Sequence, residues 1–401
     1  MHSIKEIFVI GYGPSSSHTM GPANACKYVL AKYQDIKSIK VTLFGSLAST
    51  GKGHLTDYII DLKLKSIPHE IIFDKVTEPK RHPNTLGFEI TTNKGEEFRE
   101  EILSIGGGTI ITEDSKNTDQ DVYPHSTLKE IIDFCEQSHT SLADYVRKYE
   151  DKDIDEYIRK VIKVMDEAIK RGIETEGYLP GSLKLKRKAP ELYKRLKGQL
   201  DTVENVKSLY DLIMIVGAFA TSEENASGGK IVTAPTCGSS GVIPGCLAYL
   251  YARKTEEQKI VDGMMVAGLI GMLCKTNGSI SGAEAGCQAE IGVACAMGAA
   301  LIAIAKDMGN FKASEAAEIA LEHSLGLTCD PVKGYVQIPC IERCAMYALK
   351  AKNAVSLVKL IPFNTQIISF DDSVKTMYAT GKDLACGYKE TSQKGLAELI
   401  K

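Results

Sequence analysis

The sequence pattern of this 401-residue chain changes near residue 125, and that change limits the folds open to it. Runs at residues 38–45, 70–73 and 97–105 are typical of strands bounded by turn signals. Beyond the change, apolar residues recur at helical spacing, with no convincing alternating strand. The pattern therefore predicts an α+β fold, with a small α/β domain over residues 1–125 followed by a larger all-α domain over residues 127–401.

Characteristic residues mark several helix starts. Thr127 with Glu130 forms a capping box ahead of an apolar helical stripe. The pair Gly21-Pro22 places proline at a first helical position. A further helix is expected to begin near Gly53. The apolar face predicted for that helix consists of Leu55, Tyr58, Ile59 and Leu62.

Composition argues against several classes of function. The chain has 48 basic and 51 acidic residues, a balance unlike that of nucleic-acid-binding or membrane-surface proteins. The longest apolar run of the C-terminal half, Ile291–Ala305, is shorter than the roughly 20 residues of a membrane span, so we expect a core helix. The N-terminus has no secretory signal, and eleven cysteines without export argue against a disulfide framework. We expect a cytoplasmic protein without nucleic-acid or membrane partners.

Polar, glycine-rich loops interrupt the helical pattern at five places. Each alone is typical of a turn or a helix cap, because Ser, Thr, Asn and Gly are the residues found there. Five in one chain suggest a shared site, since loops that precede helices offer unpaired N–H groups to a carboxylate or another anion. The loops cover residues 13–19, 50–54, 234–241, 276–284 and 327–331.

Two of these loops contain a histidine. His18 lies three residues before Gly21, and His54 lies at the expected first turn of its helix. A lone histidine is more often structural than catalytic. The dipole at a helix N-terminus disfavours imidazolium, however, and thereby keeps the ring neutral near pH 7, as a general base requires.

The motifs that carry a family resemblance lie in order over nearly the whole chain. They are Gly13-Pro-Ser-Ser-Ser-His-Thr19, Gly45-Ser-Leu47, Thr50-Gly-Lys-Gly-His54, Ser104-Ile-Gly-Gly-Gly108, Glu176-Gly-Tyr-Leu-Pro-Gly181, Glu224-Asn-Ala-Ser-Gly-Gly229, Ala234-Pro-Thr236, Ser279-Ile-Ser-Gly-Ala-Glu284, Gly286-Cys-Gln288, Leu325-Gly-Leu-Thr-Cys-Asp-Pro331, Val336-Gln-Ile-Pro-Cys-Ile-Glu-Arg343, Gly381-Lys-Asp383 and Tyr388-Lys-Glu-Thr391. With these motifs the chain resembles the bacterial iron–sulfur L-serine dehydratases (L-serine ammonia-lyases), in the form that fuses β and α regions in one polypeptide.

The resemblance implies a [4Fe–4S] cluster held by Cys287, Cys329 and Cys340. Three thiolates for four irons leave one iron to act as a Lewis acid on the β-hydroxyl of L-serine, while a neutral base removes the Cα proton. The products are pyruvate and ammonia. We assign the base to His54, with His18 as the alternative.

Polar residues of the same loops are the expected substrate contacts. We expect Ser15, Ser16, Ser17 and Thr19 to hold the carboxylate or ammonium of serine, and Asn277, Ser279 and Ser281 to line the opposite wall. The resemblance further implies a homodimer and a role in amino-acid catabolism and gluconeogenesis.

The chain departs from the single-chain form in two places. It is shorter between about residues 66 and 86, away from the motifs. Many single-chain members also end in a cysteine that folds back as a fourth ligand, whereas this tail has none after Cys386. We therefore expect an open or water-bound fourth site.

Three other functions fit parts of the pattern. Gly238-Ser-Ser-Gly241 with Lys230 nearby would suit a pyridoxal-phosphate enzyme, although no familiar lysine motif accompanies it. The same fold and cluster would also suit the desulfidation of cysteine or the dehydration of another hydroxy acid. A redox sensor without enzymatic activity is the third alternative, and the histidine loops argue against it.

Overall fold

The computed structural model describes residues 1–82, 84–114, 121–200, 202, 206–362 and 365–400. The chain forms two compact units, each with its own apolar core. The smaller unit spans Gly11–Asp119, and the larger unit joins Met1–Ile10 to Gln120–Lys401. Strands concentrate in the first and helices in the second, which confirms the predicted α+β class. The domain boundary near residue 125 stays a prediction.

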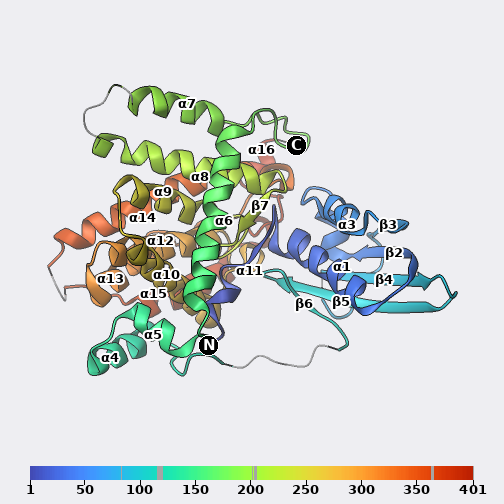
Figure 1. Ribbon diagram of the computed structural model, residues 1–401, viewed down its shortest axis with the longest axis horizontal. Helices are drawn as coiled ribbons and strands as arrows, with labels where there is room; N and C mark the ends of the chain where they lie inside the picture. Colours follow the sequence, from blue (N-terminus) through green and yellow to red (C-terminus); the bar gives the residue numbers. More distant parts are fainter. Residues whose placement is uncertain (83, 115–120, 201, 203–205, 363–364, 401) are drawn as a thin grey trace. The chain divides into compact units, whose positions relative to one another are not determined.

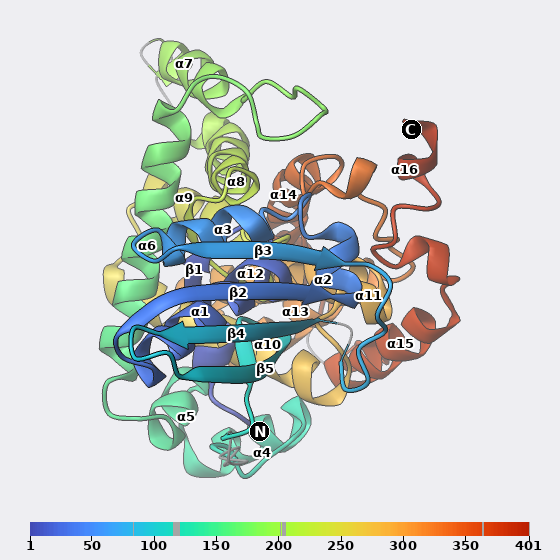
Figure 2. The same cartoon turned by 90° about the vertical axis from the view of Figure 1, so that its right-hand side faces the viewer.

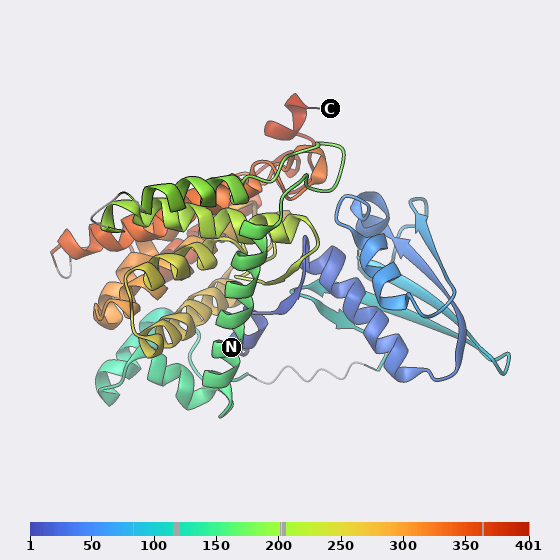
Figure 3. The same ribbon diagram turned by 45° about the horizontal axis from the view of Figure 1, so that its top comes forward.

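The smaller unit is built on a five-stranded sheet with the strand order β3-β2-β4-β5-β6. Figure 2 shows β3, β2, β4 and β5 side by side. Strands β2 and β3 run parallel, and the other neighbours are antiparallel. Helices α1 and α3 pack together on one face of this sheet (Figure 3). The elements are α1 (Gly21–Lys32), β2 (Ile36–Phe44), α2 (Gly45–Thr50), α3 (Thr56–Leu64), β3 (His69–Asp74), β4 (Thr85–Thr92), β5 (Glu97–Gly106) and β6 (Thr109–Ile111), after β1 (Ile10–Tyr12), which runs from the larger unit into the smaller one.

The face predicted for helix α3 was only partly right. Ile59 is buried as expected, but Tyr58 is 52% exposed and Leu62 is 38% exposed. The buried face instead includes Ile60 and Leu64. Both sets have helical spacing, so packing against the sheet, rather than periodicity, selects between them.

The larger unit is a helical assembly (Figure 1). Its principal elements are α4 (Leu128–Ser138), α5 (Leu142–Tyr149), α6 (Ile154–Glu174), α7 (Ala189–Leu200), α8 (Tyr210–Ala226), β7 (Lys230–Val232), α9 (Val242–Ala252), α10 (Glu257–Asn277), α11 (Gly282–Ala285), α12 (Val293–Ala305), α13 (Gly309–Glu322), α14 (Cys340–Leu360), α15 (Phe370–Asp383) and α16 (Leu396–Leu399). The short strand β7 corrects the expectation that no strand follows residue 125. It lies beside the N-terminal segment, where the Thr233 amide donates to the Val9 carbonyl over 3.0 Å.

Helix α12 lies at the centre of the larger unit and packs against α9, α10, α13 and α14. Together with the π-helical turn Gln288–Gly292, it is one of two segments among the described residues that are long and apolar enough to cross a membrane, the other being α10. Most of each segment is buried inside the protein. The core helix predicted for Ile291–Ala305 is therefore confirmed, as is the capping box of Thr127 and Glu130.

Candidate active site

Two of the three predicted cysteine ligands meet in the larger unit. Cys287 precedes the π-helical turn that leads into α12, and Cys329 lies in the loop after α13. Both side chains are buried. The ligand atoms of Cys287, Cys329 and Glu290 all lie within 4.8 Å of one another. Soft thiolates with a carboxylate form a donor set suited to iron.

The third predicted ligand, Cys340, opens helix α14. Burial and the neighbouring Cys287 thiolate both raise the pKa of the Cys340 thiol. Among the described residues, the group of donor atoms within 4.8 Å of one another contains Cys287 and Cys329 but not Cys340. The role of Cys340 as the third ligand therefore stays a prediction.

Arg343, one turn after Cys340, links the cysteine segments. Its Nη1 donates to the Thr328 carbonyl over 2.9 Å, and its Nη2 lies 3.6 Å from Asp330 Oδ1. A hydrogen bond from the Cys329 thiol lowers the pKa of Cys287, and the Arg343 guanidinium adds to this effect. The cluster of thiols is therefore electrostatically prepared to hold a thiolate.

Glu290 is a site residue that the sequence analysis missed. Its Oε1 accepts a hydrogen bond from Thr236 Oγ1 over 2.8 Å, and its Oε2 lies 3.7 Å from Cys329 Sγ. Desolvation raises the pKa of its carboxyl group. The spacing of three residues from Cys287 was the available signal, because residues three apart lie on the same side of a helical turn.

The loop before α11 borders this pocket. A Cβ atom on Gly282 would lie 3.2 Å from Cys329 Sγ and 3.0 Å from Glu290 Cδ, so only glycine fits without displacement. Of the predicted wall residues, Ser279 donates to Glu284 over 2.7 Å, and the exposed Ser281 directly precedes Gly282.

The third predicted wall residue has a different surrounding. Asn277 ends α10, and its Nδ2 donates to the Ser126 carbonyl over 2.7 Å. Its amide therefore already bonds to the chain just before α4. We find no contact that joins it to the cysteines among the described residues.

The C-terminal segment is fastened to the loop of Cys329. The Cys329 amide donates to the Tyr388 carbonyl over 2.8 Å, and the Glu390 amide donates to the Cys329 carbonyl over 2.7 Å. Burial raises the pKa of the Glu390 carboxyl to about 8, and the charges of Glu290 and Cys287 add to this rise. Cys386, in contrast, is exposed.

The two predicted base candidates lie together in the smaller unit, with ring centroids 4.7 Å apart. His54 Nδ1 lies 3.1 Å from the Thr50 carbonyl oxygen, which can only accept. The proton therefore sits on Nδ1, and the buried Nε2 keeps a lone pair. This Nε2 has no hydrogen-bond partner among the described residues.

His18 differs from His54 in that both of its ring nitrogens are engaged. Its Nδ1 lies 2.9 Å from Ser17 Oγ, and its Nε2 lies 3.0 Å from Ser46 Oγ. Burial, together with the nearby His54 ring, lowers the pKa of His18 to about 3. Burial also lowers the pKa of His54. Both rings are thus neutral near pH 7, as expected, but burial rather than the helix dipole is the main cause.

The expected polar loop before α1 is itself a π-helical turn, Ser16–Met20. Ser15 caps this turn by accepting from the His18 amide over 3.2 Å. Thr19 Oγ1 donates to the His54 carbonyl over 2.7 Å. The hydroxyl groups therefore tie the two histidine segments together, which holds both rings in fixed positions.

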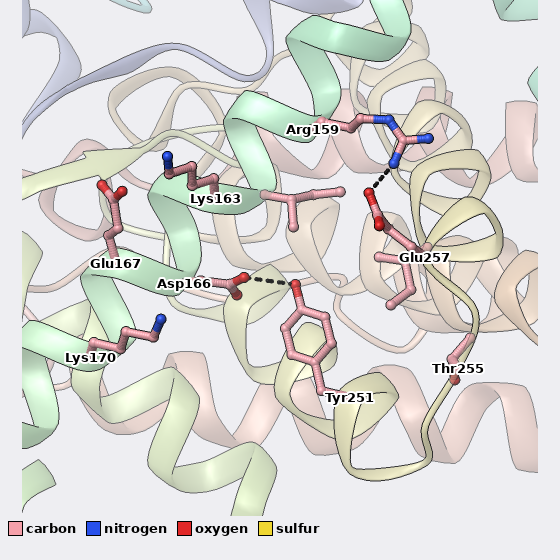
Figure 4. Close-up of a pocket in the computed structure, with 10 residues that line it drawn as sticks. Arg159, Lys163, Asp166, Glu167, Lys170, Tyr251, Thr255 and Glu257 are labelled. Atoms are coloured by element: carbon pink, nitrogen blue, oxygen red, sulfur yellow. Dashed lines mark hydrogen bonds and ion pairs between the residues drawn. The ribbon is translucent and has the colours of Figure 1, made fainter.

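A separate cavity of about 480 Å³ lies between α6 and the α9–α10 connection (Figure 4). Two pairs of its polar side chains interact: Tyr251 donates to Asp166 over 3.0 Å, and Arg159 forms an ion pair with Glu257 (Figure 4). It contains none of the predicted site residues. The cysteine group and the histidine pair described above lie outside this cavity.

Comparison with known proteins agrees with this arrangement of motifs. The family models of the serine dehydratase beta chain and the serine dehydratase alpha chain match residues 3–67 and 78–397. The alpha-chain match begins inside the smaller structural unit.

Curated relatives match along the whole chain. They include L-serine dehydratase of Haemophilus influenzae (37% identical, covering 100% of this chain and 99% of the relative), L-serine dehydratase TdcG of Escherichia coli (39%, 99% and 99%) and L-serine dehydratase of Helicobacter pylori (39%, 100% and 99%). The first alignment runs over 456 positions against 401 residues here, so that relative contains residues this chain lacks.

Proposed function

We propose a cofactor and a catalytic base for this chain, which belongs to the serine dehydratase family, with the beta and alpha regions fused in one polypeptide, and is an L-serine ammonia-lyase. We propose that it uses a [4Fe–4S] cluster held by Cys287, Cys329 and Cys340, and that His54 removes the Cα proton of L-serine. The convergence of the Cys287 and Cys329 thiols, which come from two segments distant in sequence, is the observation that carries this proposal. Cys340 is included because the family resemblance implies it.

The donor set suits such a cluster. Thiolates are the usual ligands of iron–sulfur clusters, and three of them leave one iron without a cysteine. When bound, the cluster supplies a Lewis acid that stabilises the departing hydroxide. Arg343 holds the loop of Cys329 and the start of α14 at a fixed spacing, because it contacts both the Thr328 carbonyl and Asp330.

The hydrogen bonds of the two histidines favour His54 as the base. Its Nδ1 proton is held by the Thr50 carbonyl, and its Nε2 is buried without a partner in the described residues. A neutral imidazole with a free lone pair is ready to accept a proton. His18, whose two nitrogens both contact serine hydroxyls, is better suited to hold the His54 region in place.

The substrate contacts stay part of the proposal. We place the carboxylate or ammonium of serine at Ser15, Ser16, Ser17 and Thr19, and the opposite wall at Asn277, Ser279 and Ser281. The serine and threonine hydroxyls of the first group already orient the histidine segments, so they combine a structural with a binding role.

The decisive experiment for the cofactor is anaerobic purification followed by iron and sulfide analysis and a pyruvate assay. We expect about four irons and four sulfides per chain, and turnover of L-serine that is lost in air. Turnover of threonine and cysteine measured alongside tests the substrate. Activity that survives air and is lost with hydroxylamine would refute the cluster and favour pyridoxal phosphate.

The assignment of the base is tested by His54→Gln with His18→Gln as the comparison. Loss of a general base costs roughly 10²- to 10⁴-fold in kcat, so we expect a loss in that range for H54Q at unchanged iron and sulfide content. H54Q should also stop exchange of the α-deuterium of labelled serine with solvent. A kcat within about tenfold of the unmodified enzyme would contradict the assignment.

We further propose a homodimer in the cytoplasm that serves amino-acid catabolism and gluconeogenesis. A reducing compartment would protect the cluster from oxidation. Light scattering on the anaerobic enzyme should give twice the 43.6 kDa chain mass. A monomer mass at micromolar concentration would contradict the dimer.

A further inference from the structure

The carboxylate of Glu290 lies inside the group of metal-binding atoms. In the described part of the chain, Cys287, Glu290 and Cys329 form a group whose donor atoms lie within 4.8 Å of one another. Cys287 and Glu290 lie within one turn, so the backbone fixes their spacing. Glu290 is half-buried, whereas both cysteines are buried.

The two carboxylate oxygens of Glu290 have different surroundings. Oε1 is fixed by the Thr236 hydroxyl at 2.8 Å. Oε2 accepts a hydrogen bond from the Cys329 thiol, whose Sγ is 3.7 Å away, and lies next to the backbone of Gly282. This hydrogen bond is lost when Cys329 becomes a thiolate ligand. A carboxylate that binds a metal with one oxygen commonly has its other oxygen held by a hydrogen bond, which sets its direction.

The surroundings of Glu290 leave a place for a metal. Its carboxylate and the thiols of Cys287 and Cys329 bring their donor atoms within 4.8 Å of one another. The guanidinium of Arg343 is engaged with the Thr328 carbonyl, at 2.9 Å, and with Asp330, at 3.6 Å. Carboxylates removed from water are normally paired or bound to a metal.

The C-terminal segment lies beside the loop of Cys329. The Leu396 amide donates to Asp330 Oδ2 over 2.8 Å, and Leu399 is 78% exposed. Among the described residues, Glu290 is the side chain that joins Cys287 and Cys329 in one group of donor atoms.

We propose that Glu290 binds, through Oε2, the cluster iron that the three cysteines leave without a thiolate in the resting enzyme. This inference rests on the proposed [4Fe–4S] cluster, and it replaces the open or water-bound corner expected from the sequence. Serine must then displace a carboxylate rather than a thiolate. The iron–oxygen bond to Glu290 breaks as the bond to the substrate forms, without any change in oxidation state.

The test is electron–nuclear double resonance of the reduced cluster in water enriched in oxygen-17. The anaerobic enzyme is compared with Glu290→Gln and with the control Glu342→Gln. Glu342 lies two residues after Cys340, but its side chain is 62% exposed and pairs with Lys188. We expect no coupling to solvent oxygen in the unmodified enzyme and in E342Q, and a clear coupling in E290Q, where water takes the freed position.

Coupling to solvent oxygen in the unmodified enzyme, equal to that in E290Q, would overturn the role of Glu290. That measurement alone decides the matter if E290Q fails to retain a cluster. Thr236→Val provides a second variant, because it removes the hydrogen bond to Oε1 of Glu290. This change should shift the resonance positions of the reduced cluster while the iron content stays constant. Unchanged resonance positions would also count against the proposal. Iron and sulfide analysis separates the hypothesis of a [4Fe–4S] cofactor from the hypothesis that Glu290 is its ligand. An unmodified enzyme that contains no cluster refutes the cofactor itself.

Discussion

Replacement of His18 by glutamine should make the smaller unit more resistant to acid. The His18 side chain is only 8% exposed, and burial with the nearby His54 ring lowers its pKa from 6.5 to about 3. In the unfolded chain the same imidazole takes up a proton below about pH 6.5. In the folded state the imidazole stays neutral until the pH approaches 3. The free energy of unfolding therefore has its full value above pH 6.5 and decreases as the pH falls toward 3.

The size of this effect follows from the two pKa values. At pH 5 the unfolded imidazole is protonated and the folded one is not, which costs about 2 kcal/mol relative to pH 8, at 1.36 kcal/mol per pH unit. Glutamine has no titratable group, so H18Q should lose about 2 kcal/mol less than the unmodified protein over this interval. Carboxyl groups contribute equally to both proteins and cancel in the difference.

Urea unfolding at pH 8 and pH 5 measures this difference. The chain has no tryptophan, so hydrogen-exchange mass spectrometry on peptides from residues 11–119 is the suitable signal for the smaller unit. His139→Asn, at an exposed position where helix α4 ends, is the control and should retain the full acid sensitivity. Equal acid sensitivity in H18Q and the unmodified protein would show that His18 is not held neutral, and the reasoning for neutral imidazoles would fail.

Three further results are expected. Gly172→Ala should destabilise the larger unit by about 1–3 kcal/mol, because its Cβ would lie 2.6 Å from the backbone of Ala220, whereas Gly198→Ala, with open space, should stabilise by about 0.4–1 kcal/mol; equal melting temperatures would contradict this. Cys386→Ser should leave the spectrum of the resting cluster unchanged, because this thiol is exposed, and a changed spectrum would identify it as a ligand. Iron chelation under anaerobic conditions should abolish pyruvate formation and lower the melting temperature, because a ligand that binds only the folded state stabilises it; full activity after complete iron removal would refute the cofactor.

The helices that were predicted correctly have signals contained in a few neighbouring residues. The capping box of Thr127 and Glu130 needs only a spacing of three, and the run Ile291–Ala305 is apolar on every side. Strand β4 was missed, and the face of α3 was partly wrong. Both depend on partners elsewhere in the sheet, because Leu86, Phe88 and Ile90 are buried by neighbours that the local sequence does not identify.

The cysteine pocket was predictable only through family resemblance. The three thiols are separated by 42 and 11 residues, and eleven cysteines occur in the chain, so spacing alone could not select them. Tertiary packing around α12 and α14 brings the segments together. Glu290 is different, because once Cys287 is taken as a ligand, the spacing of three residues identifies the next side chain on that side of the turn.

The choice between the two histidines shows what a sequence cannot contain. Both occur in glycine-rich loops near helix starts, and both are neutral for the same physical reason. The distinction lies in the partner atoms. The serine hydroxyls around His18 can donate or accept, so they leave its tautomer undetermined, whereas the Thr50 carbonyl can only accept and therefore fixes the proton of His54 on Nδ1. A backbone carbonyl, which every residue has, thus decides which nitrogen of His54 is free to accept a proton.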